Sequence, residues 1–200
     1  MRDRLIHSRF FDVSGPSGAG SSVSWLAGGM RAVKLAGNLP PGWCGNLMTS
    51  LSRAGISVVR GFAKRLSDQS WIAEFQIQAA GAGAEWSEVD YLAMARSRPA
   101  PGPPADIALD SYYVDASPES GQYLFLEVHG HDRVGFLASL LDRLARLSLL
   151  PEQISLETWE GRALDCFHLK AAGGGPPQAS TARELATMLD ALSLPYARVS

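Results

Sequence analysis

The sequence Asp132-Arg133-Val134-Gly135 places an acid, a base and a glycine where an apolar strand pattern gives way to a helical one. The first N–H groups of a helix lack intrahelical partners, and together with the helix dipole they favour a carboxylate. Asp132 could accept hydrogen bonds from an α-amino group or cap the helix, and Arg133 could pair with a carboxylate. Gly135 has no Cβ, so a ligand or a second backbone segment can approach it closely. This turn is therefore a candidate site for a small zwitterion.

A second turn of the same kind lies in the first half of the chain. It reads Asn38-Leu39-Pro40-Pro41-Gly42-Trp43, so it keeps a Pro-Gly step and lacks the Asp-Arg pair. The asparagine could stand in for the missing acid, and we expect a weaker site here. The candidate ligand-binding residues of the two turns are Asn38, Pro41, Gly42, Trp43, Asp132, Arg133, Gly135 and Phe136.

The elements around the two turns follow one order twice: strand, helix, strand, strand, helix, strand. The first set is expected at 31–35, 43–54, 57–62, 71–78, 85–96 and 107–113, and the second at 123–129, 134–147, 153–159, 163–170, 181–192 and 196–200. The two sets align with a constant offset, which indicates two copies of one small domain. Each copy is predicted to be a ferredoxin-like βαββαβ domain with an antiparallel sheet, which gives an α+β fold class.

The expected domain boundaries follow from composition. Residues 12–29 are rich in Gly and Ser and poor in apolar groups, so residues 1–29 are interpreted as a flexible N-terminal extension. The first domain is expected at 30–113, a linker at 114–122 and the second domain at 123–200.

The segment from Asp132 to Leu137 reads Asp-Arg-Val-Gly-Phe-Leu. It is similar to the Asp-Arg-Pro-Gly-Leu-Leu motif that joins the first strand to the first helix of ACT domains, with Val134 in place of the proline. The strands expected at 154–158 and 164–167, joined by a glycine turn, resemble the family's later strand pair. The resemblance covers 123–200 and extends to 30–113 mainly through the repeat. A chain with two such domains resembles the two-ACT glycine-cleavage repressor group, which lacks an enzyme domain.

The resemblance implies a regulatory protein and not an enzyme. ACT domains bind small ligands, most often amino acids, at interfaces between copies. The expected activity is therefore amino-acid sensing, with ligand-dependent association with a partner protein. The two copies could pair their sheet edges or pack their helices together, and either arrangement is expected to bring the two glycine turns towards a shared interface. We also expect a homodimer, with four copies in all.

Composition and charge argue against several other classes of protein. The formal net charge is −2, and segments 30–113 and 121–200 carry net charges of +1 and −2, so neither half has a basic stripe for nucleic acid. Cys44 and Cys166 lie far apart, which suits a reducing cytoplasm. No apolar run approaches the ~20 residues of a membrane-spanning helix, and residues 1–11 do not read as a secretory signal. We expect a cytoplasmic protein without a cofactor or a membrane partner.

Two motifs imitate nucleotide and RNA sites. Segment 15–22 resembles a P-loop, but Ser21 occupies the position of the phosphate-binding lysine. The segment from Arg60 to Ala63 matches the first half of an RNP1 motif, and Lys64 and Arg65 then break the match. An RNA-binding ferredoxin-like domain remains the weaker alternative.

The histidines and cysteines do not assemble a reactive site from sequence alone. His129, His131 and His168 lack a convincing metal-ligand spacing. Cys166 is expected to be a structural cysteine, and its neighbour Asp165 should point to the opposite face of the strand. A further alternative is an interaction module whose ligand site is vestigial.

Overall fold

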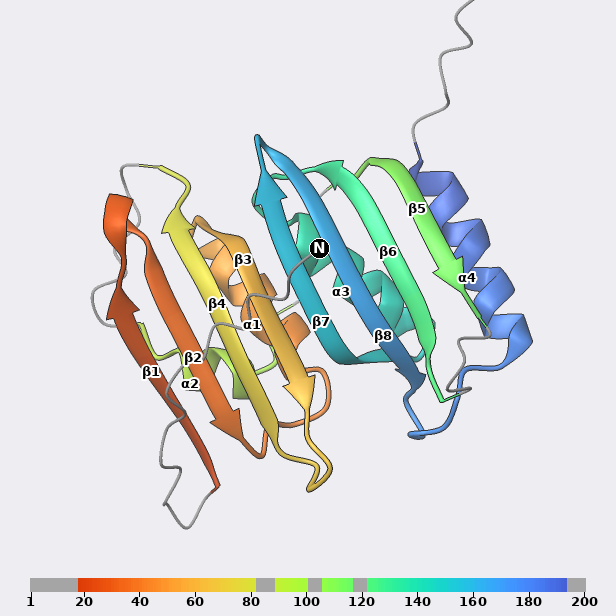
Figure 1. Cartoon of the computed structure of the whole chain (residues 1–200), viewed down its shortest axis with the longest axis horizontal. Helices are drawn as coiled ribbons and strands as arrows, with labels where there is room; N and C mark the ends of the chain where they lie inside the picture. Colours follow the sequence, from red (N-terminus) through yellow and green to blue (C-terminus); the bar gives the residue numbers. More distant parts are fainter. Residues whose placement is uncertain (1–17, 82–88, 101–105, 117–121, 194–200) are drawn as a thin grey trace, which may run out of the picture.

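The computed structural model describes residues 18–81, 89–100, 106–116 and 122–193 of the chain (Figure 1). The strands are β1 (Ala19–Trp25), β2 (Arg31–Gly37), β3 (Ile56–Arg65), β4 (Trp71–Ala79), β5 (Leu109–Asp115), β6 (Leu124–His131), β7 (Leu149–Trp159) and β8 (Arg162–Ala171). The helices are α1 (Trp43–Arg53), α2 (Tyr91–Arg96), α3 (Phe136–Arg146) and α4 (Ala179–Leu192), with a short 3-10 turn η1 (Ala27–Gly29).

All eight strands form one sheet in the order β1-β2-β4-β3-β7-β8-β6-β5, and each neighbouring pair is antiparallel. The four α-helices lie on one side of the sheet, with α1 and α3 behind its centre (Figure 1). This confirms the predicted α+β class with two ferredoxin-like units.

The two halves of the sheet meet at β3 and β7 with a symmetric register. Phe62 lies opposite Ser155, and these two residues correspond to each other in the repeat. Arg60 pairs with Glu157, which is the counterpart of Lys64 in the repeat, and Lys64 pairs with Gln153, which is the counterpart of Arg60. The joint therefore has approximate twofold symmetry.

The buried face of each strand follows the alternation expected from the sequence. In β4, Trp71, Ala73, Phe75 and Ile77 are buried against the helices, whereas the residues between them are more exposed. In α3 the buried side chains recur at three- and four-residue steps. A single apolar core extends through both halves of the sheet.

The expected flexible extension at residues 1–29 is wrong for part of its length. Residues 19–25 form the edge strand β1, which pairs with β2 from Ala19↔Gly37 to Trp25↔Arg31. An edge strand can be rich in Ser and Gly because its backbone hydrogen bonds to β2 do not require apolar side chains. Residues 1–17 lie outside the described part of the chain.

The strand predicted at 107–113 also differs in its partner. It is observed as β5 and pairs with β6 of the second half, in the register Tyr113↔Glu127, and not with a strand of the first half. It includes 114–115, which were assigned to the linker. In each half the outer strand therefore comes before the repeat unit in the chain and does not end it: β1 pairs with β2, and β5 pairs with β6. The edge beside β2 or β6 can accept a strand from the chain segment before the unit as well as from the segment after it. The strand predicted at 196–200 lies outside the described residues.

Candidate functional site

The two glycine turns share one backbone conformation. Gly42 and Gly135 directly precede α1 and α3 and have left-handed φ angles of 76° and 92°. The N–H of Trp43 donates to the carbonyl of Pro40 at 3.1 Å, and the N–H of Phe136 donates to the carbonyl of Arg133 at 2.9 Å. A Cβ on Gly42 would meet nothing within 4 Å, so the left-handed φ explains this glycine better than close packing does.

Asp132 does not cap α3, so the capping role considered for it is wrong. No side chain caps this helix. The half-buried Asp132 carboxylate instead accepts a hydrogen bond from Thr158 Oγ1 at 3.1 Å, and its N–H donates to the Gly161 carbonyl at 2.8 Å. These two bonds attach the β6–α3 turn to the end of the β7–β8 hairpin.

Asp165 is a buried carboxyl on the helix-facing side of β8, next to this turn. It is 4% exposed and shares that face with Ala163 and Phe167. Within the described ranges, no group donates a hydrogen bond to its side chain. Burial and the charge of Asp132 raise the pKa of Asp165 from 3.8 to about 8. Burial also raises the pKa of Asp132, and the hydrogen bond from Thr158 opposes that rise.

Asp165 was not among the predicted site residues, although the sequence contains a signal for it. In β8, Ala163, Phe167 and Leu169 are buried, and Asp165 lies between them in the same alternation. Extending this alternation would have placed the carboxyl in the core. Cys166 points to the opposite face, which confirms the predicted divergence of these two neighbours.

The equivalent space in the first half is filled by apolar side chains. Leu39 takes the place of Asp132, and Ala73 takes the place of Asp165, because Ala73 pairs with Leu35 as Asp165 pairs with Val128. Trp43 and Trp71 pack edge-to-face in this region, with ring centroids 5.3 Å apart. The first half thus has the turn without its polar group.

The remaining predicted site residues divide between core and surface. Trp43 and Phe136 are each 2% exposed and belong to the core. Asn38, Pro41 and Arg133 are exposed, so only residues around Asp132 combine a polar side chain with partial burial.

The two turns do not approach a shared interface within the chain. Each step across the sheet from β2 to β6 is antiparallel, so these two strands run in opposite directions. Their carboxyl ends, and hence the two turns, lie at opposite ends of the sheet (Figure 1). The expectation of one joint site within the chain is wrong.

The thiols are poor nucleophiles, and His129 has an ordinary polar partner. Burial raises the pKa of Cys44 to about 12, and burial with the adjacent Glu127 raises the pKa of Cys166 to about 11. His129 Nε2 lies 2.9 Å from Glu127 Oε1 on the open face of the sheet. Among the residues with a described structure, no three His, Cys, Asp or Glu side chains could hold a metal ion. None of the described helices is long and apolar enough to cross a membrane.

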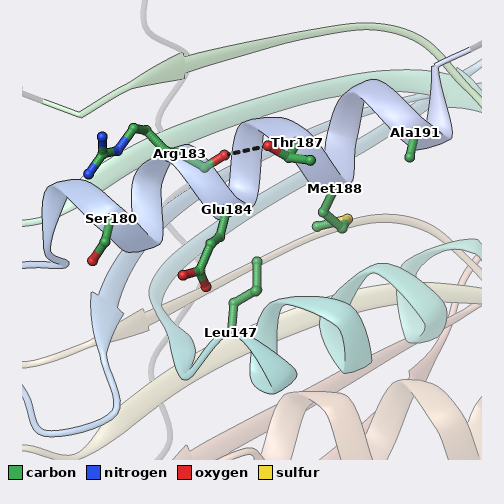
Figure 2. Close-up of a pocket in the computed structure, with 7 residues that line it drawn as sticks. All are labelled: Leu147, Ser180, Arg183, Glu184, Thr187, Met188 and Ala191. Carbon is green, nitrogen blue, oxygen red and sulfur yellow. Dashed lines mark hydrogen bonds between the residues drawn. The ribbon is translucent and has the colours of Figure 1, made fainter.

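A groove of about 560 Å³ lies along α4, beside the carboxyl end of α3 (Figure 2). Leu147 faces Met188 across it, and the other lining residues come from one side of α4. Asp132 precedes α3 and Leu147 follows it, so the groove lies at the other end of that helix. None of the predicted ligand-binding residues lines the groove.

Comparison with known proteins gives only distant similarity. No family model matches the chain. No curated protein matches it. Among solved structures, it is similar to the crystal structure of aspartate kinase from Synechocystis, with 17% sequence identity and a TM-score of 0.48. The match covers 82% of this chain and 27% of the kinase chain, so the chain spans about a quarter of that protein's length. The fold assignment rests on the strand order of this chain itself.

Proposed function

We propose that the chain is a regulatory protein of the ACT type that binds an amino acid at the β6–α3 turn. The observation that carries this proposal is the polar group of Asp132, Thr158 and Asp165 beside a left-handed glycine and the first turn of α3. The helix N-terminus favours the ligand carboxylate, and the aspartates favour its ammonium group. Such a site binds a zwitterion and has no need of a catalytic group.

The first half acts as a structural partner in this proposal. Trp43, Trp71 and Leu39 fill its equivalent space, so we expect one ligand for each chain. Ligand binding then changes the association of the chain with a second copy or with a partner protein. We also propose a cytoplasmic homodimer, and the sequence resemblance supports a role like that of the two-ACT glycine-cleavage repressor group.

Thermal denaturation of the full chain with each of the twenty amino acids tests the proposal. One or a few should raise the melting temperature, because a ligand that binds only the folded state stabilises it. Calorimetry on each hit should give one site per chain. A folded sample that responds to no amino acid would contradict the proposal and favour an interaction module with a vestigial site.

A matched pair of variants locates the site. Gly135→Val should abolish the response, because a branched side chain resists the left-handed φ and so distorts the turn that carries Asp132. Gly42→Val makes the same change at the first turn, far from the proposed site, and should leave ligand affinity within about twofold of that of the unsubstituted chain. Both variants should lose similar stability, so the pair is matched. Equal loss of binding in both variants would refute the assignment to the second turn.

A further inference from the structure

We propose that Asp132 and Asp165 form a subsite for an ammonium group, so the ligand of the β6–α3 turn must carry a primary amine. This inference rests on the proposed function and adds the chemical class that the site selects. It assigns a binding role to Asp165, which lies in the sheet and outside the turn itself.

The geometry gives the two carboxyls different depths. Asp132 is half-buried and hydrogen-bonds Thr158, whereas Asp165 is 4% exposed. Thr158 pairs across the hairpin with Ala163, and Asp165 lies two residues further along the same face of β8. Asp165 is therefore the next polar side chain inward from the Asp132–Thr158 hydrogen bond on that face.

Among the described residues, none donates a hydrogen bond to the Asp165 carboxyl. Its neighbours in the sheet are Val128 on β6 and Leu156 on β7, and neither can hydrogen-bond through its side chain. Within the described part of the chain, Asp132 is the ionisable group that acts on it. A buried carboxyl is stabilised by a partner that donates several hydrogen bonds, and an ammonium group donates three.

The two halves supply an internal comparison for this role. At the equivalent positions the first half has Leu39 and Ala73, which cannot bind a cation. A small apolar residue, Ala73, is therefore sufficient for packing at the position of Asp165. The carboxyl of Asp165 is not required by the architecture, and the ammonium subsite gives it a function.

Binding of an amine should release a proton. Burial and the charge of Asp132 raise the pKa of Asp165 to about 8, so its carboxyl is mostly protonated at neutral pH. A bound ammonium group stabilises the carboxylate, and the displaced proton passes to the buffer. Calorimetry at pH 7 in phosphate and in Tris, which differ in ionisation enthalpy, should show release of up to one proton per ligand.

The closing experiment compares the full chain with Asp165→Asn and Asp165→Ala. The probes are the twenty amino acids, the 2-hydroxy acid of each hit, and ethylamine and putrescine as amines without a carboxylate. Asp165→Asn should weaken amino-acid binding by about ten- to a hundredfold and abolish proton release. The 2-hydroxy acids should bind at least tenfold more weakly than the amino acids. Asp142→Asn, on the exposed side of α3, serves as the control and should bind normally.

The outcomes separate this inference from the proposed function. If an amino acid binds the unsubstituted chain, but Asp165→Asn and the 2-hydroxy acid bind equally well, the ammonium subsite is refuted and the sensor remains. If only the simple amines bind, and they require Asp165, the subsite stands and the amino-acid sensor is refuted. If neither amines nor amino acids bind, both are refuted. Asp165→Ala, which carries the residue of the first half, keeps the test valid if the asparagine variant does not fold.

Discussion

The two halves of the molecule build the same turn and fill the space beside it in opposite ways. Both turns place a left-handed glycine before a helix of eleven residues. In the first half Leu39, Trp43 and Trp71 form a packed apolar cluster, and in the second half Asp132 and Asp165 occupy the corresponding region. The backbone of this turn therefore does not determine its chemistry, and a small number of side chains separates an apolar turn from a polar one.

The largest expected effect comes from the apolar version of the turn. Trp43→Ala should lower the free energy of unfolding by about 3–5 kcal/mol, because it removes a fully buried ring that packs on Trp71 and Phe75. Urea denaturation measures this change. Trp159→Ala is the control, since Trp159 is 73% exposed, and it should alter stability by less than about 0.5 kcal/mol. A loss below about 1 kcal/mol for Trp43→Ala would show that the first turn is not a packing site.

In the second half, removing the characteristic side chain should raise the free energy of unfolding at high pH, whereas in the first half it lowers it. Below about pH 4 the Asp165 carboxyl is protonated in both the folded and the unfolded chain, and from there to about pH 8 only the unfolded chain ionises it. Stability should therefore fall as the pH rises through this range, and the loss should stay constant above it. Asp165→Asn removes the ionisation and should be more stable than the unsubstituted chain at pH 9, by on the order of 2–3 kcal/mol.

Urea denaturation of both proteins at pH 5 and pH 9 checks this sign. Asp142→Asn is the matched control, because Asp142 is exposed and pairs with Arg146 on the surface of α3. A fall in stability for Asp165→Asn at pH 9 would mean that the buried carboxylate has a stabilising partner within the protein itself.

The shared backbone predicts equal effects at the two glycines. Gly42→Ala and Gly135→Ala should each lower the free energy of unfolding by about 1–2 kcal/mol, because alanine resists a left-handed φ. Gly20→Ala is the control, since a Cβ there meets nothing within 4 Å and its φ is not in the left-handed range. Thermal denaturation should rank the three variants. A difference above about 1 kcal/mol between the two turn variants would show that their backbones are not equivalent.

The smallest effect is expected at the joint between the halves. Arg65 Nη1 lies 2.8 Å from Glu152 Oε1 across β3 and β7, and both side chains are partly exposed. A double-mutant cycle with Arg65→Gln and Glu152→Gln should give a coupling of about 0.5–1 kcal/mol that decreases at high salt. A coupling above about 2 kcal/mol, or one insensitive to salt, would mean that this pair and not the shared core holds the halves together.

Much of the fold could be predicted because its central elements have strong periodicity. The alternation of Trp71, Ala73, Phe75 and Ile77 identified β4, and the repeat identified α1 and α3 together. Edge strands were harder. The strand at 19–25 has little apolar alternation, since its stability comes from backbone pairing with β2. A strand was expected at 107–113 and is observed as β5, but the local sequence contains no information on which half of the sheet contains its partner strand.

The site was only partly predictable for a related reason. Asp132 was found from a local motif, yet its hydrogen bond to Thr158 joins elements that the motif does not contain. Asp165 required both the alternation of β8 and its alignment with Ala73 in the repeat. A contact between separate strands is a property of the sheet register, which the periodicity of one strand does not specify.

The symmetric register at Phe62 and Ser155 has a consequence for the history of the molecule. A twofold register of this kind is also the one that symmetry requires where two identical strands pair across the axis of a homodimer. In such a dimer every substitution is made twice, and an acid at the position of Asp165 would also appear at the position of Ala73. Once both units lie on one gene, each position mutates independently. Fusion of the units therefore leaves the sheet unchanged and allows one unit to keep a packed interior while the other acquires two carboxyls.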